Sequence, residues 1–171
     1  MLGFLVRWKI RSAEKKLGEP LDYLRQMFDH SPGAFWKFAK VAQASAYRNK
    51  LPAAPFHVAR VVAVRHQDCG PCVQTVINLA KADGVEPAIL KAAYLGNVDA
   101  LPESLRDVYR FAEAIAVNDG NETEYRDRLR SVFGEEAMVE LALAITLCQT
   151  FPILKRGLGH AKSCSLVKID I

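Results

Sequence analysis

The sequence predicts an all-α protein built around a single helical-bundle domain. Apolar residues recur at three- and four-residue spacings along nearly the whole chain, as on the buried faces of helices. No long segment alternates apolar and polar residues in the manner of a strand. Hydrophobic residues make up 50% of the 171 positions, enough for one sizeable core. We expect an N-terminal helical extension over residues 1–30, a helical domain over 31–156 and a C-terminal tail over 157–171.

The first expected helices lie in the N-terminal part of the chain. Residues 2–17 carry apolar and basic side chains in an amphipathic pattern, and we expect this helix to dock on the protein's own core. A position on a membrane surface is the alternative. Ser31 and Pro32 then mark an N-cap and a first-turn proline, and apolar residues continue at helical spacing from Phe35 to Ala42.

The next two helices flank the dipeptide Gly70-Pro71. Pro55 opens the first of them, which should end near Asp68 because glycine and proline do not fit a helix interior. The second is expected to begin near Pro71 and to end before Gly84, its C-cap.

The rest of the domain is expected to be helical at residues 86–95, 102–117, 125–133 and 135–151. Gly134 separates the last two of these helices, and Pro152 should kink or end the last. From Met138 onward this last helix is nearly all apolar, so we expect it at the centre of the fold or at a subunit interface.

The strongest chemical signal is the segment Cys69-Gly-Pro-Cys72, which places two thiols one helical turn apart at the expected start of a helix. Thiols at this spacing are within reach of a disulfide. The partial positive charge of a helix N-terminus lowers the pKa of a thiol, and the thiolate is the form that attacks a peroxide or a disulfide. Cys69 is nearer the helix terminus, so this argument makes it the more acidic thiol.

Ionisable residues precede the two cysteines. His57 and His66 are candidate bases for proton transfer, because an unperturbed imidazole titrates at about pH 6.5. Alternatively, each histidine is an ordinary residue on the polar face of its helix. Arg65 either favours a thiolate or is a solvated charge. Asp68 either raises the pKa of a neighbouring thiol or, as we expect, caps the following helix.

Two further cysteines lie near the C-terminus. Cys148 falls within an apolar helix, so we expect it in the core. His160 and Cys164 lie in the tail, which is expected on the surface. Alternatively the tail folds back and completes a zinc site with Cys69 and Cys72, or supplies a histidine or a third thiol to them.

Residues Pro55–Val85 place an apolar helix before Cys-x-x-Cys and an Ala-x-x-Gly-Val segment after it. This arrangement resembles the core motif of the alkylhydroperoxidase D-like, or carboxymuconolactone decarboxylase-like, family. The resemblance implies an all-helical homo-oligomer that reduces hydroperoxides without a metal or an organic cofactor. In the family's peroxidases the second cysteine, Cys72 here, attacks the peroxide, and the first, Cys69 here, resolves the sulfenic acid to a disulfide. A thiol-bearing partner protein then restores the dithiol.

The chain departs from the family pattern at two positions. His57 stands where the family has a glutamate twelve residues before the first cysteine, and Val76 stands where it has a histidine four residues after the second. These positions form the family's proton relay, so the relay is incomplete here. His57 is then the first candidate for its base, and His66 is the second.

The sequence therefore predicts a thiol-dependent peroxidase or disulfide oxidoreductase with an antioxidant role. Its expected partners are a hydroperoxide substrate and a thiol or dithiol reductant protein. We expect a cytoplasmic homo-oligomer with no transmembrane segment. Basic residues are dispersed rather than gathered in a motif, which argues against nucleic-acid binding. The alternative is a helical redox-sensing or interaction protein without peroxidase activity, or a zinc-stabilised one.

Overall fold

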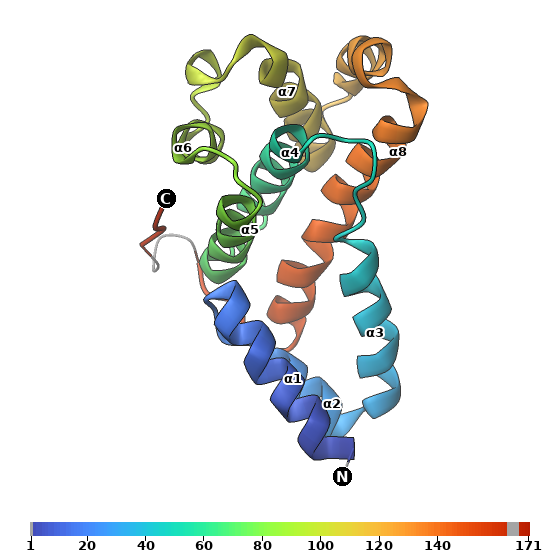
Figure 1. Cartoon of the computed structure of the whole chain (residues 1–171), viewed down its shortest axis with the longest axis vertical. Coiled ribbons are helices and arrows are strands. Elements are labelled where there is room, and N and C mark those ends of the chain that lie inside the picture. Colours follow the sequence, from blue (N-terminus) through green and yellow to red (C-terminus); the bar gives the residue numbers. More distant parts are fainter. Residues whose placement is uncertain (1, 164–167) are drawn as a thin grey trace.

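The computed structural model describes residues 2–163 and 168–171 (Figure 1). Over these residues the chain forms eight α-helices, one short 3₁₀ helix and no strand, which confirms the all-α prediction. In chain order the elements are α1 (Leu2–Leu17), α2 (Asp22–His30), α3 (Pro32–Ala44), α4 (Ala53–Arg65), α5 (Gly70–Ala82), α6 (Pro87–Leu95), η1 (Val98–Ala100), α7 (Glu103–Val117) and α8 (Glu122–Gly157).

Helix α4 is the centre of the bundle. Every residue from Pro55 to Val64 is buried, so most of its length has no solvent-facing side. It packs against α5, α6, α7 and α8, which surround it in Figure 1. A helix that is apolar nearly all round is stable only when enclosed in this way. The two polar residues within this run, His57 and Arg60, are therefore carried into the interior of the protein.

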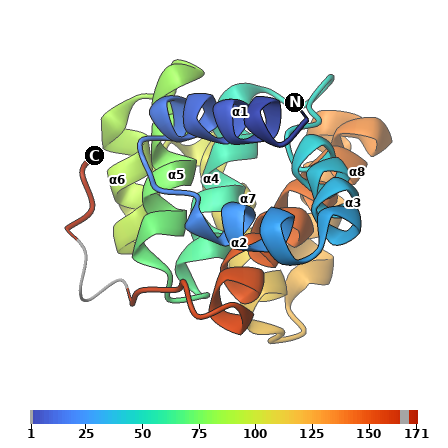
Figure 2. The same cartoon turned by 90° about the horizontal axis from the view of Figure 1, so that it is seen from below.

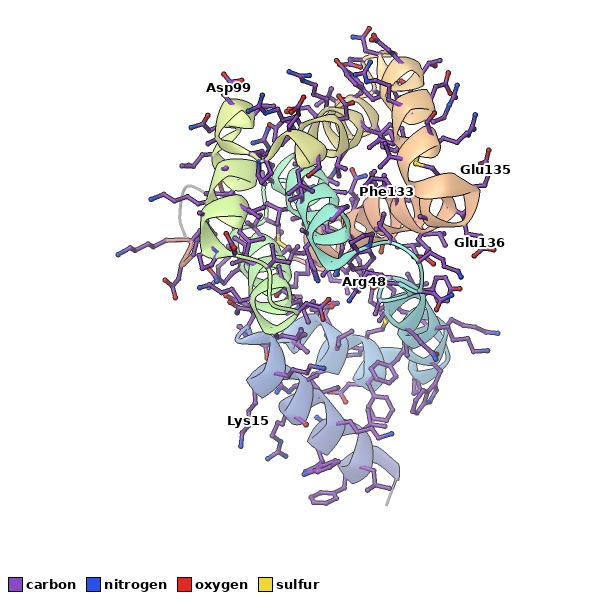
Figure 3. The ribbon with its side chains drawn as sticks, turned by 45° about the horizontal axis from the view of Figure 1, so that its top comes forward. Lys15, Arg48, Asp99, Phe133, Glu135 and Glu136 are labelled. Carbon is purple, nitrogen blue, oxygen red and sulfur yellow. A yellow bond between two sulfur atoms is a disulfide. The ribbon has the colours of Figure 1, made fainter. Side chains whose placement is uncertain are left out.

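Helix α8 consists of two helical segments that meet at a kink, as the sequence predicts. Gly134, the expected end of one helix, has φ 80° and ψ 170°, and α8 changes direction there (Figure 1). Glycine adopts this backbone conformation without strain. Figure 3 shows Glu135 and Glu136 pointing outward at the bend. Pro152 does not end α8, which continues to Gly157, so this half of the expectation is wrong, whereas a kink at Pro152 stays a prediction. The fixed φ of proline is itself helical, but its ring removes one backbone hydrogen bond and crowds the preceding turn.

The predicted helix starts are close to the observed ones. Ser31 occupies the N-cap position of α3 with Pro32 in the first turn, although the serine side chain makes no capping hydrogen bond. Helix α4 begins at Ala53, ahead of Pro55. Helix α5 closes at Gly84 as predicted: this glycine follows the C-cap Asp83 with φ 82°, and the next N–H, that of Val85, donates a hydrogen bond of 3.0 Å to the Ala80 carbonyl.

The N-terminal helices form a second, smaller apolar core at one end of the bundle (Figure 2). Val6 and Ile10 of α1 are buried in it. Its other buried members are Leu21, Tyr23 and Phe35, and the partly buried Leu154 and Leu158 of α8 pack against them. The Asn78 side chain of α5 donates a hydrogen bond of 2.7 Å to the Leu17 carbonyl, which fixes the end of α1 to the bundle. Residues 2–17 thus dock on the protein's own core, as expected.

A buried carboxylate joins the loop before α4 to α8. Glu140 is only 3% exposed, and it accepts hydrogen bonds of 2.9–3.0 Å from the backbone N–H groups of Asn49, Lys50 and Leu51. Burial alone raises the pKa of a carboxyl, but these donors outweigh it and the pKa of Glu140 is lowered. The charge of Glu140 therefore holds the start of α4 against α8.

Among the described helices, α8 is the one that is long and apolar enough to cross a membrane by length and composition. Of its most apolar window, 44% is buried inside the protein, and the core helix of a compact bundle has the same properties. Helix α8 also carries the buried charge of Glu140 and packs against α4 and α7. The absence of a transmembrane segment stays a prediction.

Candidate redox site at the start of α5

The cysteine pair begins α5, where the sequence places it. Asp68 precedes it with φ 44°, a left-handed conformation that is uncommon outside glycine. Cys69 is extended and occupies the N-cap position, and Pro71 lies in the first turn, where its missing N–H costs nothing. The expectation that Asp68 is the cap is therefore wrong by one residue. The Asp68 carboxylate instead accepts a hydrogen bond of 2.9 Å from the Ser163 hydroxyl of the tail.

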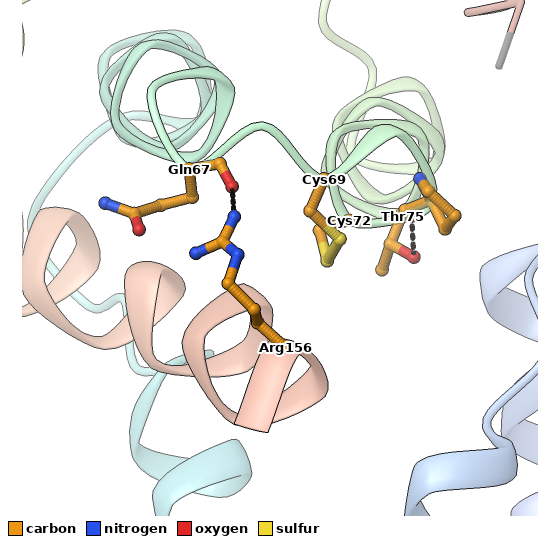
Figure 4. The surroundings of a disulfide bond; sticks show 6 residues. Gln67, Cys69, Cys72, Thr75 and Arg156 are labelled. Atoms are coloured by element: carbon orange, nitrogen blue, oxygen red, sulfur yellow. Dashed lines mark hydrogen bonds between the residues drawn. A yellow bond between two sulfur atoms is a disulfide. The ribbon is translucent and has the colours of Figure 1, made fainter. Parts of the chain in front are cut away.

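Cys69 and Cys72 form a disulfide, with their Cα atoms 5.2 Å apart (Figure 4). The structure thus has the pair in its oxidised state. Cys69 is fully buried and Cys72 is 5% exposed. Cys148, the one free cysteine among the described residues, is buried in the core as expected, and burial raises the pKa of its thiol to about 12. A thiol with that pKa is inert at neutral pH, so among the described cysteines the pair is the candidate for redox chemistry.

Cys72 borders a cavity of about 650 Å³ that lies between the two apolar cores. Helices α1, α2, α3, α4, α5 and α8 all contribute to its walls. The residues of α5 that line it lie on one face of the helix, between Cys72 and Asp83. The residues of α4 that line it lie between Phe56 and Val64. Cys69 does not line this cavity. Of the two cysteines, Cys72 is therefore the one that lies against the cavity.

His57 lines the same cavity as Cys72. The side chain is 3% exposed, and its Nε2 lies 3.0 Å from the carboxylate of Asp83. Burial lowers the pKa of His57 to about 4, although hydrogen bonding to Asp83 acts in the opposite direction. The His57 hydrogen bond and the neighbouring Arg48 in turn lower the pKa of Asp83, so the carboxylate is ionised.

The proton of the His57 ring can be placed from these contacts. An ionised carboxylate only accepts hydrogen bonds, so the neutral ring donates its Nε2–H to Asp83. Nδ1 is then unprotonated, and within the described part of the chain it has no hydrogen-bond partner. The structure thus places a neutral base with a free lone pair beside the cavity that Cys72 borders. The sequence argument, which chose His57 from its position alone, is consistent with this geometry.

His66 lies elsewhere. It is the C-cap of α4, and its Nε2 is 3.1 Å from the carboxylate of Glu113 on α7. Arg65 binds the same carboxylate at 2.7 Å, which makes it part of an ion pair rather than the solvated charge we expected. Neither residue lines the cavity of Cys72. Of the two histidines, His57 and not His66 lines the cavity that Cys72 borders, but its partner Asp83 lies eleven residues beyond Cys72 along α5, a rise of about 16 Å.

Two cationic residues that line the cavity were not predicted from the sequence. Arg60 is 6% exposed and Lys155 is 4% exposed, and both line the cavity. The available signal was the spacing on α4, since Arg60 follows His57 by one helical turn and is the one charged residue between Pro55 and Val64. Lys155 could not be associated with them from the sequence, because only the packing of α8 beside α4 brings it close.

The position of the absent relay histidine stays apolar. Val76 lines the cavity one turn beyond Cys72, and no titratable group replaces the histidine there. The neighbouring hydroxyl of Thr75 donates a hydrogen bond of 2.9 Å to the Pro71 carbonyl, which keeps the first turn of α5 closed (Figure 4). Position 76 therefore offers no group for proton transfer at Cys72.

The tail folds back over the start of α5, which corrects the expectation of a surface tail. The Lys162 carbonyl accepts a hydrogen bond of 3.0 Å from the N–H of Gly70, and Arg156 donates to the Gln67 carbonyl beside the disulfide (Figure 4). Pro71 and His160 line a second cavity of about 480 Å³ on this side. His160 itself hydrogen-bonds Gln26 and not a cysteine.

A zinc site receives no support from the described residues. Within residues 2–163 and 168–171, no group of three or more histidine, cysteine, aspartate or glutamate side chains is arranged to hold a metal ion. Cys164, the fourth ligand of the hypothetical site, lies outside the described residues.

No family model, no curated protein and no solved structure matches this chain. The resemblance to the alkylhydroperoxidase D-like family therefore rests on the Cys-x-x-Cys motif and its helical context alone.

Proposed function

We propose that the protein is a thiol-dependent peroxidase in which Cys72 attacks a hydroperoxide and Cys69 resolves the product to a disulfide. The observation that carries the proposal is the position of Cys72, which borders a cavity large enough for a small organic molecule while Cys69 lies buried behind it. The helix-terminus argument favoured Cys69 as the nucleophile, but access to the cavity supports Cys72. An alkylhydroperoxidase D-like fold, a homo-oligomer and a cytoplasmic location belong to the same proposal.

The reaction balances with two thiols and one hydroperoxide. The Cys72 thiolate attacks the terminal oxygen of ROOH; an S–O bond forms, the O–O bond breaks, and the alkoxide takes a proton and leaves as an alcohol. The Cys69 thiolate then attacks the sulfur of the Cys72 sulfenic acid, an S–S bond forms, and hydroxide leaves as water after protonation. The thiols supply both protons and both electrons. A thiol or dithiol reductant then reduces the disulfide by exchange and is itself oxidised.

His57 is the proposed proton acceptor for this chemistry. Its pKa of about 4 leaves the ring neutral at pH 7, with the Nδ1 lone pair free. It can therefore exchange a proton with a hydroperoxide or water bound in the cavity, which would carry the proton to or from Cys72, because the contact with Asp83 lies about 16 Å along α5 from that cysteine. Asp83 holds the required tautomer through the hydrogen bond from Nε2. This arrangement would replace the relay that Val76 interrupts.

The first test is a single turnover. Pre-reduced protein is mixed with one equivalent of an organic hydroperoxide, and free thiols and mass are followed over time. We expect rapid loss of two thiols and a mass decrease of about 2 Da, the mass of two hydrogens, with peptide mapping placing the bridge between Cys69 and Cys72. No reaction within minutes would contradict the proposal.

Two serine variants separate the roles of the cysteines. Cys69→Ser should still be oxidised once, to a sulfenic acid at Cys72 that a dimedone probe traps, whereas Cys72→Ser should not react. A matched Cys164→Ser variant should behave like the natural chain. If Cys72→Ser reacted at full rate, Cys72 would not be the nucleophile.

A redox sensor is the second candidate, and the valine at position 76 favours it, because this site lacks the relay histidine. A sensor would oxidise slowly with peroxide yet equilibrate readily with glutathione. The same single-turnover experiment, repeated with oxidised glutathione in place of peroxide, decides between the two functions.

A further inference from the structure

The cavity beside Cys72 contains two buried cations that no anion of the described chain neutralises. Arg60 makes no ion pair or hydrogen bond through its side chain within residues 2–163 and 168–171, and its buried Nε has no partner there. Its one close contact is the ring of Phe56, whose centroid is 5.0 Å from the guanidinium carbon. Lys155 contacts the ring of Tyr23, whose centroid is 5.2 Å from Nζ, and forms no ion pair within the described part of the chain. Both cations line the same cavity.

We infer that this cavity binds the carboxylate of an apolar organic molecule, with Arg60 and Lys155 as the residues that recognise the charge. The inference deepens the proposed function and, in naming the substrate, rests on it: the hydroperoxide reduced at Cys72 belongs to the class of carboxylic acids with an apolar tail. The binding of the acid itself does not depend on any turnover.

The need for an anion follows from the energetics of buried charge. A charged group removed from water is costly unless it is paired and hydrogen-bonded. An arginine remains protonated even when burial lowers its pKa, as it does for Arg60, so the charge persists. Its planar fork of N–H groups matches a carboxylate in two parallel hydrogen bonds. A carboxylate in the cavity would satisfy the arginine and interact with the ammonium of Lys155.

The acidic residues already present do not fill this role. Asp83 lines the cavity, but its carboxylate is held by His57 at 3.0 Å and by Arg48 at 2.8 Å. Glu19 and Asp22 lie near enough to raise the pKa of Lys155 slightly, but burial outweighs them and the pKa is lowered. Neither forms an ion pair with Lys155 in the described structure, so the cavity keeps a positive excess.

The other residues that line the cavity favour a ligand with a large apolar part. Most other wall residues are aliphatic or aromatic, among them Leu17, Leu21, Leu24, Val64, Leu79 and Phe151. A volume of about 650 Å³ falls within the range of small-molecule sites, and such sites combine apolar walls with a few fixed polar groups. A short acid such as acetate would leave most of this surface uncovered, whereas a tail of about ten carbons would use it.

Binding is tested on the oxidised protein by titration calorimetry with decanoate as the probe. We expect one site per chain and an affinity at least tenfold higher for decanoate than for decanol, which has the same tail and no charge. Acetate, which has the charge and no tail, should not bind detectably. Equal affinity for decanoate and decanol would overturn the role of the cations, and no binding of decanoate would overturn the site.

Two cation variants and one matched control locate the site. Arg60→Met and Lys155→Met should each weaken decanoate binding at least tenfold while leaving decanol unchanged. Arg130→Met removes an exposed arginine that pairs with Asp127 and Glu135 away from the cavity, and it should leave both affinities unchanged. If one cation variant does not fold, by circular dichroism, the other decides. Decanoate binding that survives in every folded cation variant would contradict the inference.

The outcome is separable from that of the peroxidase proposal. Decanoate is not a substrate, and a Cys69→Ser, Cys72→Ser double variant should still bind it. If the protein binds decanoate but consumes no hydroperoxide, the binding site stands and the peroxidase proposal fails. If it reduces cumene hydroperoxide and a fatty-acid hydroperoxide with the same KM, the peroxidase stands and the carboxylate specificity fails. We expect the KM for the fatty-acid hydroperoxide to be at least tenfold lower, and Arg60→Met to abolish that difference.

Discussion

Glu140 and Arg60 are both charged, both in core helices and both almost fully buried, yet their surroundings are opposite. Glu140 accepts hydrogen bonds from three consecutive backbone N–H groups at 2.9–3.0 Å. Arg60 has no hydrogen-bond partner for its Nε in the described chain and rests against the ring of Phe56. The first charge joins two segments of the fold, whereas the second faces a cavity.

The difference in hydrogen bonding distinguishes a charge that stabilises the fold from one that, in our proposal, binds a ligand. A fully hydrogen-bonded buried carboxylate stabilises the segments that it connects. An unsatisfied buried cation destabilises the folded state, and replacing such a group by an apolar one is often neutral or stabilising. The carboxylate ligand proposed above would account for Arg60, which lines the cavity of Cys72 and whose buried Nε has no hydrogen-bond partner in the described chain.

The largest expected effect is at Glu140. Glu140→Ala leaves three N–H groups without acceptors, one in a buried and two in partly buried hydrogen bonds, and we expect a loss of about 3 kcal/mol, which lowers the Tm by roughly 6–12 °C in a chain of this length. Urea unfolding at pH 7.5 measures the loss. The matched control is Glu136→Ala on the same helix, 77% exposed and 3.9 Å from Lys50, which should change stability by less than about 0.5 kcal/mol. Equal losses in the two variants would remove the special role of Glu140.

The pH dependence of stability distinguishes the two regions next. The pKa of His57 is lowered from 6.5 to about 4 in the folded protein, so the unfolded chain binds more protons between these values. Its contribution is fully present above pH 6.5 and is lost as the pH falls towards 4, by roughly 3 kcal/mol at most. The pKa of Glu140 is lowered from 4.5, so its contribution is present above that value and is lost only below it.

The window from pH 6.5 to 4.5 therefore reports on His57 and not on Glu140. Urea unfolding across this window should show a falling free energy for the natural chain and a flatter curve for His57→Gln. The exposed histidine of α2 gives a control, His30→Gln, which should follow the natural curve. A His57→Gln curve that falls as steeply as the natural one would mean that His57 is not held neutral by burial.

The same contrast explains how much of the molecule was predictable from the sequence. Local signals placed the helix starts and the cysteine pair, because Gly70-Pro71 after an apolar run can only sit at a helix boundary. The bend at Gly134 was also marked by a residue with unusual backbone freedom. The prediction that the helix ends at Pro152 was wrong, because α8 packs against the N-terminal helices and α3 and continues despite the lost hydrogen bond.

The site was predictable only as far as one helix extends. Cys72 was found from the motif, and His57 from its place in the resemblance. Lys155 and Arg60 line one cavity because α8 packs beside α4, and no spacing along the chain encodes that arrangement. Asp83 was missed as the partner of His57 for the same reason, because it belongs to the far end of α5.

A smaller effect of opposite sign is expected at Arg60. Arg60→Met should leave the free energy of unfolding unchanged or raise it by about 1 kcal/mol, because it removes an unsatisfied buried charge. Decanoate should raise the Tm of the natural chain and not that of the variant, since a ligand stabilises only the state that binds it. Thermal unfolding with and without decanoate measures both effects. A destabilisation like that of Glu140→Ala would show that Arg60 is a structural charge after all.

The smallest effect is expected where the charges face water. Arg7 and Asp29 form an ion pair of 2.6 Å between α1 and α2, with side chains 46% and 38% exposed. Asp29→Asn should cost no more than about 0.5 kcal/mol, because solvent already screens both charges, and even that cost should vanish in 1 M salt. Urea unfolding of this variant at low and high salt measures it. A loss as large as that of Glu140→Ala would mean that stability follows the number of ion pairs. A negligible loss would show that burial and hydrogen bonding decide how much a charge contributes to stability. That rule is the basis for assigning Arg60 to a ligand.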